Sequence, residues 1–228
     1  MMPDPEKKTA GVYDNLPAAE YHSDPCHVPS LSASIASTLL SRSPRHAWLK
    51  HPRLNPNWQP EERAAFDIGK AAHALLLEGE TVVEVIDAKD WRTNDAKDKR
   101  AEAYAASKVP LLAAQWAEVK AMVDAVRPQL DQFQEPEVRA ALRPENGKSE
   151  RTMIWREGEA WCRIRPDWTD NECTQIWDYK TTSASANPEA WGGRTLFNLG
   201  ADFRAAFYRR GVMVLHPKVM SPVYRFIV

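Results

Sequence analysis

The sequence predicts an α/β protein in which a helical part is followed by a β-meander. Apolar residues recur at helical spacing through residues 30–130, and from Ser149 onward they alternate as they do in strands. The chain has 228 residues, of which 43% are hydrophobic and 27% are charged. This length and composition suit one soluble domain with a substantial core. We therefore expect a single domain over residues 1–228, with residues 1–60 as its irregular and helical N-terminal part.

The N-terminal part begins with polar, proline-punctuated chain over residues 1–29, which we expect to fray and then to lie irregularly on the surface. A helix is predicted to open at Ser30–Ser34, with Ser32 as its cap, and to be interrupted near Pro44. The stretch 42–53 around that proline is the most basic of the chain. Its charges are typical of a solvated face, and alternatively of a contact for a nucleic-acid backbone.

A second helix is predicted over Glu61–Glu78, because its apolar stripe ends at Gly79, a suitable C-terminal cap. Gly69 and its small neighbours would allow another element to approach closely. His73 lies among them, and a lone helical histidine is typically a satisfied structural group. The chain up to residue 142 is then predicted as a strand over 81–87, a charged connection over 89–100, helices over 101–108 and 111–130 on either side of Pro110, and a short helix over 136–142.

The predicted meander contains strands over 152–156, 160–167 and 174–181, with Glu150 at its entrance. The segment 168–173 is polar and turn-rich, so the last two strands can pair as a hairpin. The chain then continues through a loop at 183–188, one helical turn at 189–193, a helix over 199–215 and a strand over 223–228. Because no turn follows this last strand, we expect that the chain is truncated.

The hairpin of the last two meander strands would bring Asp167 close to Asp178. Alternation along the strand places Asp178 and Lys180 on one face, and Trp177 and Tyr179 on the other. Two facing carboxylates repel unless a cation lies between them, and oxygen ligands suit magnesium or manganese. Lys180 could hold a water or stabilise negative charge at phosphorus. The alternative is a surface hairpin whose charges are merely solvated.

The composition argues against several classes of protein. The sequence contains no apolar run of spanning length and no secretory leader, so we expect no membrane association and a cytoplasmic location. Three scattered cysteines are typical of reduced thiols, and they are too few for a four-thiolate iron–sulfur cluster. The 30 basic and 31 acidic side chains give a net charge of −1, which gives no global support for nucleic-acid binding.

Several separated segments together resemble one family. The chain is similar to the exodeoxyribonuclease VIII-like branch of the PD-(D/E)XK nuclease superfamily, found in phage and prophage recombination systems. The resemblance spans the sequence from about Tyr13 to Val228, and its order and spacing are specific in combination. It is carried by Ser30-Leu31-Ser32-Ala33-Ser34, Ser43-Pro44-Arg45-His46-Ala47, Gly69-Lys70-Ala71-Ala72-His73 with Leu77-Glu78, Pro166-Asp167, Asp178-Tyr179-Lys180, and Ala205-Ala206-Phe207-Tyr208.

The resemblance implies a restriction-endonuclease-like core, in which a mixed central sheet containing the meander is flanked by helices. It also implies roles for individual residues. His73, Asp167 and Asp178 match metal ligands, which reverses the structural interpretation of the histidine. Lys180 matches the catalytic lysine, and Tyr179 would lend its backbone carbonyl to the metal.

Other positions also match segments of the family. Glu150 matches a glutamate before the meander, which faces the metal, supports its ligands or is simply a solvated strand end. Ser32, Ser34, Arg45 and Tyr208 fall in matching segments that we assign to substrate binding.

One position departs from the family. Arg204 stands one turn before Tyr208, where related nucleases carry glutamine. We expect Arg204 to bind a phosphate directly, to pair with Glu150, or to mark altered substrate handling.

The function that the resemblance implies is Mg²⁺-dependent hydrolysis of duplex DNA from its ends, with Mn²⁺ able to substitute. The strand would be digested 5′→3′, and the 3′ single-stranded tail would pass to a single-strand annealing protein during recombination. A ring-shaped homo-oligomer around DNA is implied in the same way. The alternatives are a structure-specific endonuclease, and a catalytically inactive DNA-binding module on the same fold.

Overall fold

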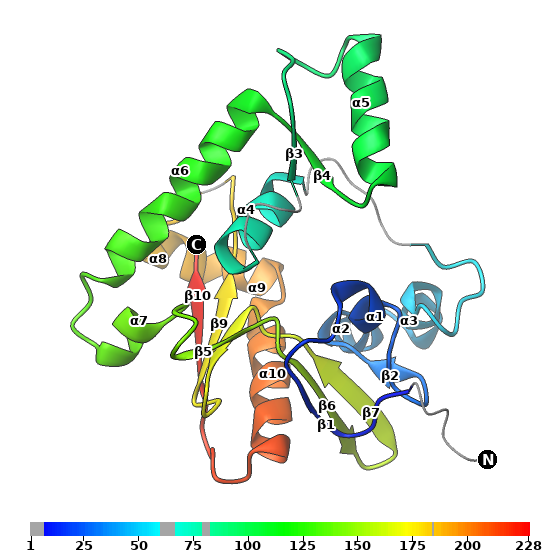
Figure 1. The fold of residues 1–228 in the computed structure, drawn as a ribbon. Helices are drawn as coiled ribbons and strands as arrows, with labels where there is room; N and C mark the ends of the chain where they lie inside the picture. Colours follow the sequence, from blue (N-terminus) through cyan, green and yellow to red (C-terminus); the bar gives the residue numbers. More distant parts are fainter. Residues whose placement is uncertain (1–6, 60–66, 79–82, 184) are drawn as a thin grey trace. The chain divides into compact units, whose positions relative to one another are not determined.

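The structure, a computed structural model, describes residues 7–59, 67–78, 83–183 and 185–228 (Figure 1). The chain divides into two compact units, each built from separate segments. Unit 1 comprises Met1–Pro60, Leu142–Asp178 and Thr182–Phe226, and unit 2 comprises Glu61–Ala141, Tyr179–Thr181 and Ile227–Val228. The single domain expected over 1–228 stays a prediction. The predicted start of the helix at Glu61, its cap Gly79 and the start of the strand at Thr81 lie outside the described residues, as do residues 1–6.

Unit 1 contains two four-stranded sheets. The first has the strand order β1-β6-β7-β2, and the second has the order β10-β9-β8-β5. The first sheet is mixed, because β6 pairs antiparallel with β1 and β7 while β2 joins β7 in parallel. The strands are β1 (Gly11–Tyr13), β2 (Ser30–Leu31), β5 (Gly147–Ser149), β6 (Thr152–Glu157), β7 (Ala160–Ile164), β8 (Trp168–Asp170), β9 (Gln175–Tyr179) and β10 (Val223–Ile227).

The predicted meander is wrong at its second turn. β6 and β7 form the expected hairpin, but β7 ends at Ile164 and the next strand, β8, belongs to the other sheet. Pro166 has no N–H to donate to a ladder, so pairing with β6 is not continued through this residue. Part of the segment predicted as a turn is therefore a strand, and β8 pairs antiparallel with β9. One central sheet was expected, whereas the described residues of unit 1 form two.

Most helices of unit 1 follow the predicted positions, but residues 11–29, which were expected to be irregular, contain strand β1 and a helix over Ala18–His22. Ser32 caps α2, since its Oγ accepts from the Ile35 amide at 3.4 Å, and Ser43 caps a new helix that begins at Pro44. The predicted interruption near Pro44 is thus confirmed. The helices are α1 (Ala18–His22), α2 (Ala33–Ser41), α3 (Pro44–Lys50), α8 (Pro188–Ala190), the π-helical segment η3 (Trp191–Thr195), α9 (Leu196–Asn198) and α10 (Ala201–Leu215).

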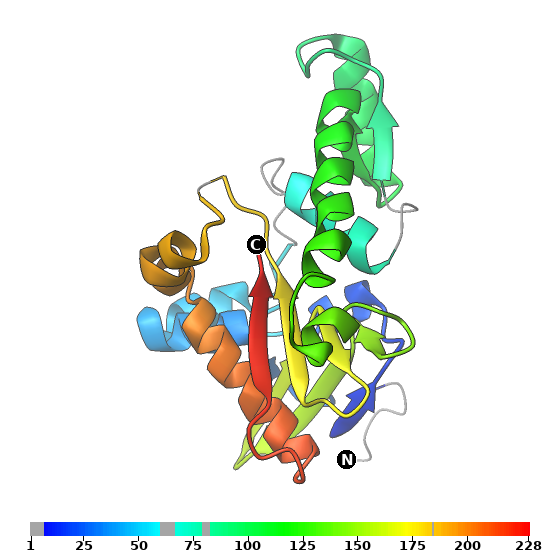
Figure 2. The ribbon, with the colours of Figure 1, turned by 90° about the vertical axis from the view of Figure 1, so that its left-hand side faces the viewer.

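The core of unit 1 forms where α10 packs on the sheets, and β10 lies beside β9 (Figures 1 and 2). A Cβ at Gly211 of α10 would lie 2.7 Å from the Trp155 ring, so only glycine lets the helix approach this closely. The buried cluster takes side chains from both sheets and from the helix: Met153, Trp155, Cys162, Ile164, Cys173, Ile176 and Val212. Burial of this cluster joins the two sheets into one packed body.

Unit 2 contains a parallel pair of strands joined by a helix. Its elements are α4 (Asp67–Leu77), β3 (Val83–Ile86), α5 (Asn94–Ala105), β4 (Val109–Leu112), α6 (Ala113–Leu130) and α7 (Pro136–Ala140). The structure differs from the sequence-based prediction at two places in unit 2. The charged connection is largely helix α5, which Thr93 caps, and Pro110 lies within strand β4. Among the strands that the structure describes, β4 pairs with β3 alone, and an edge strand tolerates proline. Among the described residues, no helix has the length and apolar character needed to cross a bilayer.

Candidate metal centre

Three acidic residues stand at one level on three neighbouring strands of unit 1. β5 pairs antiparallel with β8, and β8 pairs antiparallel with β9. If each of these two strand pairings is extended by one residue pair, Asp167 lies opposite Glu150 on one side and opposite Asp178 on the other. The Glu150 amide donates to the Asp167 carbonyl at 3.1 Å, which extends the β5–β8 ladder to this level. The expected closeness of Asp167 and Asp178 therefore arises from β8 and β9, and we call these three residues the acidic row.

The backbone at the first member of the row is unusual. Glu150 has a φ of 55°, in the left-handed region that non-glycine residues enter at a cost of about 1–2 kcal/mol. Its amide is tied to Asp167, and its carboxylate forms an ion pair with Arg165. Arg165 is itself fixed, because a guanidinium nitrogen donates to the Leu16 carbonyl at 2.6 Å. These contacts hold the turn between β5 and β6 in place.

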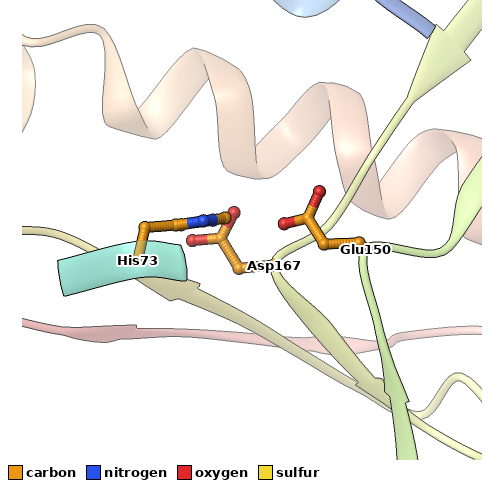
Figure 3. Close-up of side chains that lie close together, drawn as sticks. All are labelled: His73, Glu150 and Asp167. Atoms are coloured by element: carbon orange, nitrogen blue, oxygen red, sulfur yellow. The ribbon is translucent and has the colours of Figure 1, made fainter. Parts of the chain in front are cut away.

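Glu150 and Asp167 can offer ligands to one ion. A carboxylate oxygen of each lies within 4.8 Å of one from the other, and both side chains are half-buried. Figure 3 draws the two carboxylates facing each other; it also labels His73, which belongs to unit 2. Two carboxylates at this separation repel in the absence of a cation, so the pair favours binding of a positively charged group.

Asp178 is buried, with 3% of its surface exposed. Its Oδ2 meets one hydrogen-bond donor and one cation of unit 1. The Tyr224 hydroxyl of β10 donates to this oxygen at 2.9 Å, and a guanidinium nitrogen of Arg204 in α10 lies 3.7 Å from it. The carboxylate is therefore oriented by one neutral and one cationic group.

Ionisation at this end of the row follows from burial and charge. Burial, followed by the charge of Asp178, raises the pKa of Tyr224 far above its ordinary value, so the phenol stays neutral. Burial acts to lower the pKa of the Arg204 guanidinium, but Tyr208, Asp178, Tyr224 and Asp167 together outweigh burial and raise this pKa. Burial also raises the pKa of Tyr208 well above its ordinary value, and its hydroxyl donates to the Arg165 carbonyl at 3.3 Å.

The remaining predicted ligands lie in unit 2. A Cβ at Gly69 of α4 would lie 3.0 Å from Thr181 Oγ1, so the helix approaches the chain just beyond β9. His73 is one turn further along α4 and on the same helix face as Gly69. The Lys180 ammonium donates to the Tyr179 carbonyl at 3.1 Å, the carbonyl that was predicted to bind metal.

The predicted substrate-binding residues lie in separate helices of unit 1. Ser32 and Ser34 are at the start of α2, with their hydroxyl oxygens 3.1 Å apart. The Arg45 guanidinium stacks on Trp48, 4.5 Å from the ring centroid. Arg204 was expected to bind a phosphate, to pair with Glu150 or to mark altered substrate handling. It pairs with Asp178 in the structure, a contact that was not expected, and Glu150 pairs with Arg165.

Sequence reasoning missed two residues of the site. Arg165 lies two positions before Asp167 in a strand-like stretch, so alternation could have placed both on one face. Tyr224 lies in the predicted last strand, but the sequence carries no signal that this strand pairs with β9. Both residues act by holding a carboxylate of the row.

Comparison with known proteins agrees with this architecture. A family model described as a PDDEXK-like domain of unknown function (DUF3799) matches residues 38–225. The crystal structure of a "Putative exonuclease" from Eubacterium rectale has a TM-score of 0.52 and 14% sequence identity, over 93% of this chain and 71% of that chain. No curated protein matches significantly. The restriction-endonuclease-like α/β fold is confirmed, whereas the exodeoxyribonuclease VIII-like branch stays a prediction. The chain belongs to the family of PDDEXK-like domains of unknown function.

Proposed function

We propose that the protein is a metal-dependent deoxyribonuclease. The observation that carries this proposal is the acidic row, in which Glu150, Asp167 and Asp178 stand at one level on β5, β8 and β9. Lys180 follows Asp178 by two residues, so an extended chain presents both on one face. The PDDEXK-like family and the neighbour named as an exonuclease support the same activity.

The donor set suits a hard divalent cation. Carboxylate oxygens are the ligands that Mg²⁺ and Mn²⁺ prefer, and two carboxylates of the row already lie within reach of one ion. We infer that Asp167 and Asp178 hold Mg²⁺, with Mn²⁺ as a substitute. When bound, the ion would activate a water and neutralise charge on the scissile phosphate.

We infer that His73 adds a nitrogen ligand. Within unit 2, the face of α4 that carries Gly69 and His73 packs at Thr181, three residues beyond Asp178. Because Thr181 follows Asp178 closely in the chain, His73 as a ligand is supported by its place on the helix face that meets Thr181. Imidazole nitrogen is a ligand that Mn²⁺ accepts more readily than Mg²⁺, so loss of His73 should weaken Mn²⁺ binding in particular.

The other residues of the site have distinct roles in this proposal. Glu150, held by Arg165, adds negative charge next to Asp167 and supports its ligation. Lys180 orients the attacking water or stabilises developing charge on the phosphate. Its ammonium donates to the Tyr179 carbonyl, and a carbonyl oxygen has a second lone pair that can face a cation.

The substrate we propose is the end of a DNA duplex, digested 5′→3′ to leave a 3′ tail for an annealing protein. Ser32, Ser34, Arg45, Arg204 and Tyr208 would contact its backbone. A homo-oligomeric ring around the duplex would make the digestion processive. Since the net charge is only −1, DNA binding would depend on local basic side chains together with the cation.

End-labelled linear duplex tests the proposal. Nucleotide release should require Mg²⁺, and Asp178→Ala and Lys180→Ala should each lower it about a hundredfold or more. Lys148→Ala, which removes an exposed strand lysine from β5, is the matched control and should keep full activity.

Three outcomes separate the candidate functions. Unchanged activity in both site variants would place the site elsewhere. Cutting of a covalently closed circular duplex would identify an endonuclease. A wild-type chain that binds DNA but releases no nucleotide would be identified as an inactive binding module. Labels at the 5′ and at the 3′ end, compared in parallel, report the polarity.

A further inference from the structure

Two arginines flank the acidic row, and they are held very differently. Arg165 pairs with Glu150 at one end, and its side chain is only 9% exposed. It is fixed there by its bond to the Leu16 carbonyl. Arg204 pairs with Asp178 at the other end at 3.7 Å, and its side chain is 37% exposed. Arg165 is thus part of the scaffold, whereas Arg204 lies beyond hydrogen-bond distance of its carboxylate and is partly exposed.

The oxygen that Arg204 contacts belongs to a carboxylate that we assign to metal binding. Asp178 is almost fully buried, and a buried carboxylate that stays charged requires a nearby positive charge or strong donors. The Tyr224 hydroxyl supplies a donor at 2.9 Å, and Arg204 supplies the charge. A divalent cation at Asp178 would supply more charge than the guanidinium, so the two cations oppose each other at this position.

We propose that Arg204 is a mobile counter-ion that competes with the metal for Asp178 and leaves it for a DNA phosphate. The inference rests on the proposed function and deepens it. Without DNA, Arg204 neutralises Asp178 and weakens metal binding. With DNA, a phosphate draws the exposed guanidinium away, because arginine binds phosphate in a bidentate manner. Metal and DNA then bind cooperatively, and the site is fully loaded only when substrate is present.

The size of the effect follows from the exposure of the pair. A partly exposed ion pair shifts an equilibrium by up to about fivefold. Repulsion between the guanidinium and a divalent cation adds to this shift. We therefore expect that removal of the charge at position 204 tightens metal binding about threefold to tenfold.

The test is calorimetric titration of Mn²⁺ into the full chain without DNA. Arg204→Gln should bind Mn²⁺ more tightly than the wild type. Arg210→Gln is the matched control, since it removes the same charge from the same helix, where Arg210 pairs with the exposed Glu157. Arg210 lies six residues further along α10, or about 9 Å along its axis, so Arg210→Gln should bind like the wild type.

A second variant, at Tyr224, separates the effect of the Arg204 charge from the effect of how the Asp178 carboxylate is oriented. Tyr224→Phe removes the other donor to the same oxygen without changing charge, and it should leave Mn²⁺ binding unchanged or weaken it. Thermal melting of each variant shows whether it is folded. If Arg204→Gln binds Mn²⁺ no more tightly than the wild type, or if Tyr224→Phe tightens binding equally, the competition is refuted.

The coupling is tested with a short phosphorothioate duplex that resists hydrolysis. Saturation with this duplex should tighten Mn²⁺ binding to the wild type, and it should tighten binding to Arg204→Gln by a clearly smaller factor. Equal factors in the two proteins would overturn the role of Arg204 in coupling. A wild-type chain that binds no Mn²⁺ under either condition would instead refute the proposed function itself, so the two failures are distinguishable.

Discussion

The substitution Gly147→Ala should displace Glu150 of the acidic row, although Gly147 lies three residues before Glu150 in the chain. Gly147 begins β5, and a Cβ there would lie 2.1 Å from the Thr169 carbonyl oxygen and 2.2 Å from the Trp168 ring. Both atoms belong to β8, the partner strand. An ordinary contact needs at least 3.4 Å, so β5 would have to move away by more than about 1 Å.

The cost of this movement can be worked from its parts. Overpacking of a dense site costs about 1–3 kcal/mol, and each ladder hydrogen bond lost between the two strands costs about 1 kcal/mol more. We expect a loss of about 3 kcal/mol. For a chain of this size, that corresponds to a fall of about 6–12 °C in Tm. Because β5 carries Glu150 to Asp167, Mn²⁺ binding should weaken in the same variant.

Thermal melting and Mn²⁺ calorimetry on two glycine variants give the measurement. Gly192→Ala is the matched control, since a Cβ at Gly192 meets no atom within 4 Å and the change should stay within about 0.5 kcal/mol. A melting temperature for Gly147→Ala within 1 °C of the wild type would refute the close pairing of β5 with β8. It would also remove the basis for placing Glu150 in the row.

Three further predictions concern stability. Burial lowers the pKa of His51 below 6.5, against the opposing charge of Asp24, so the unfolded chain takes up the proton more readily. Stability should therefore fall as the pH drops below about 6.5, and urea midpoints at pH 7.5 and 5.5 should differ less in His51→Gln. Ile176→Ala, at a fully buried position, should lower the free energy of unfolding by about 2–5 kcal/mol in urea titrations. Thr93→Ala removes the cap of α5, and hydrogen exchange should show α5 amides less protected by about 1 kcal/mol.

Local patterns in the sequence predicted most elements because their causes are local. Ser32 caps a helix through its own hydroxyl, and Pro44 starts another because the first turn needs no amide donor. The hairpin of β6 and β7 follows from alternation around a short turn. Asp167 and Asp178 were predicted as a pair from the spacing of their residue types along the chain. This spacing is the same whichever strands carry the two residues.

The missed features depend on long-range pairing. Helix α5 has no apolar stripe, so its charged sequence was interpreted as a connection. Strand β4 contains Pro110, which is excluded only from strands that pair on both sides. The partner of Asp178 on β10 could not be predicted, because the pairing of Tyr224 with this residue joins positions 46 residues apart.

The acidic row lies where the chain passes from one sheet to the other. The register of β6 with β7, extended beyond Met153 and Ile164, sets Glu150 opposite Asp167, and the register of β5 with β8 does the same. The pairing of β8 with β9 adds Asp178 on the other side of Asp167. Three carboxylates in a row are costly without a cation, and Arg165 and Arg204 at the two ends offset that cost. The same contacts that offset this repulsion therefore set how tightly metal can bind. A variant that lacks Arg204 should therefore bind Mn²⁺ more tightly in calorimetry and melt at lower temperature when metal is removed.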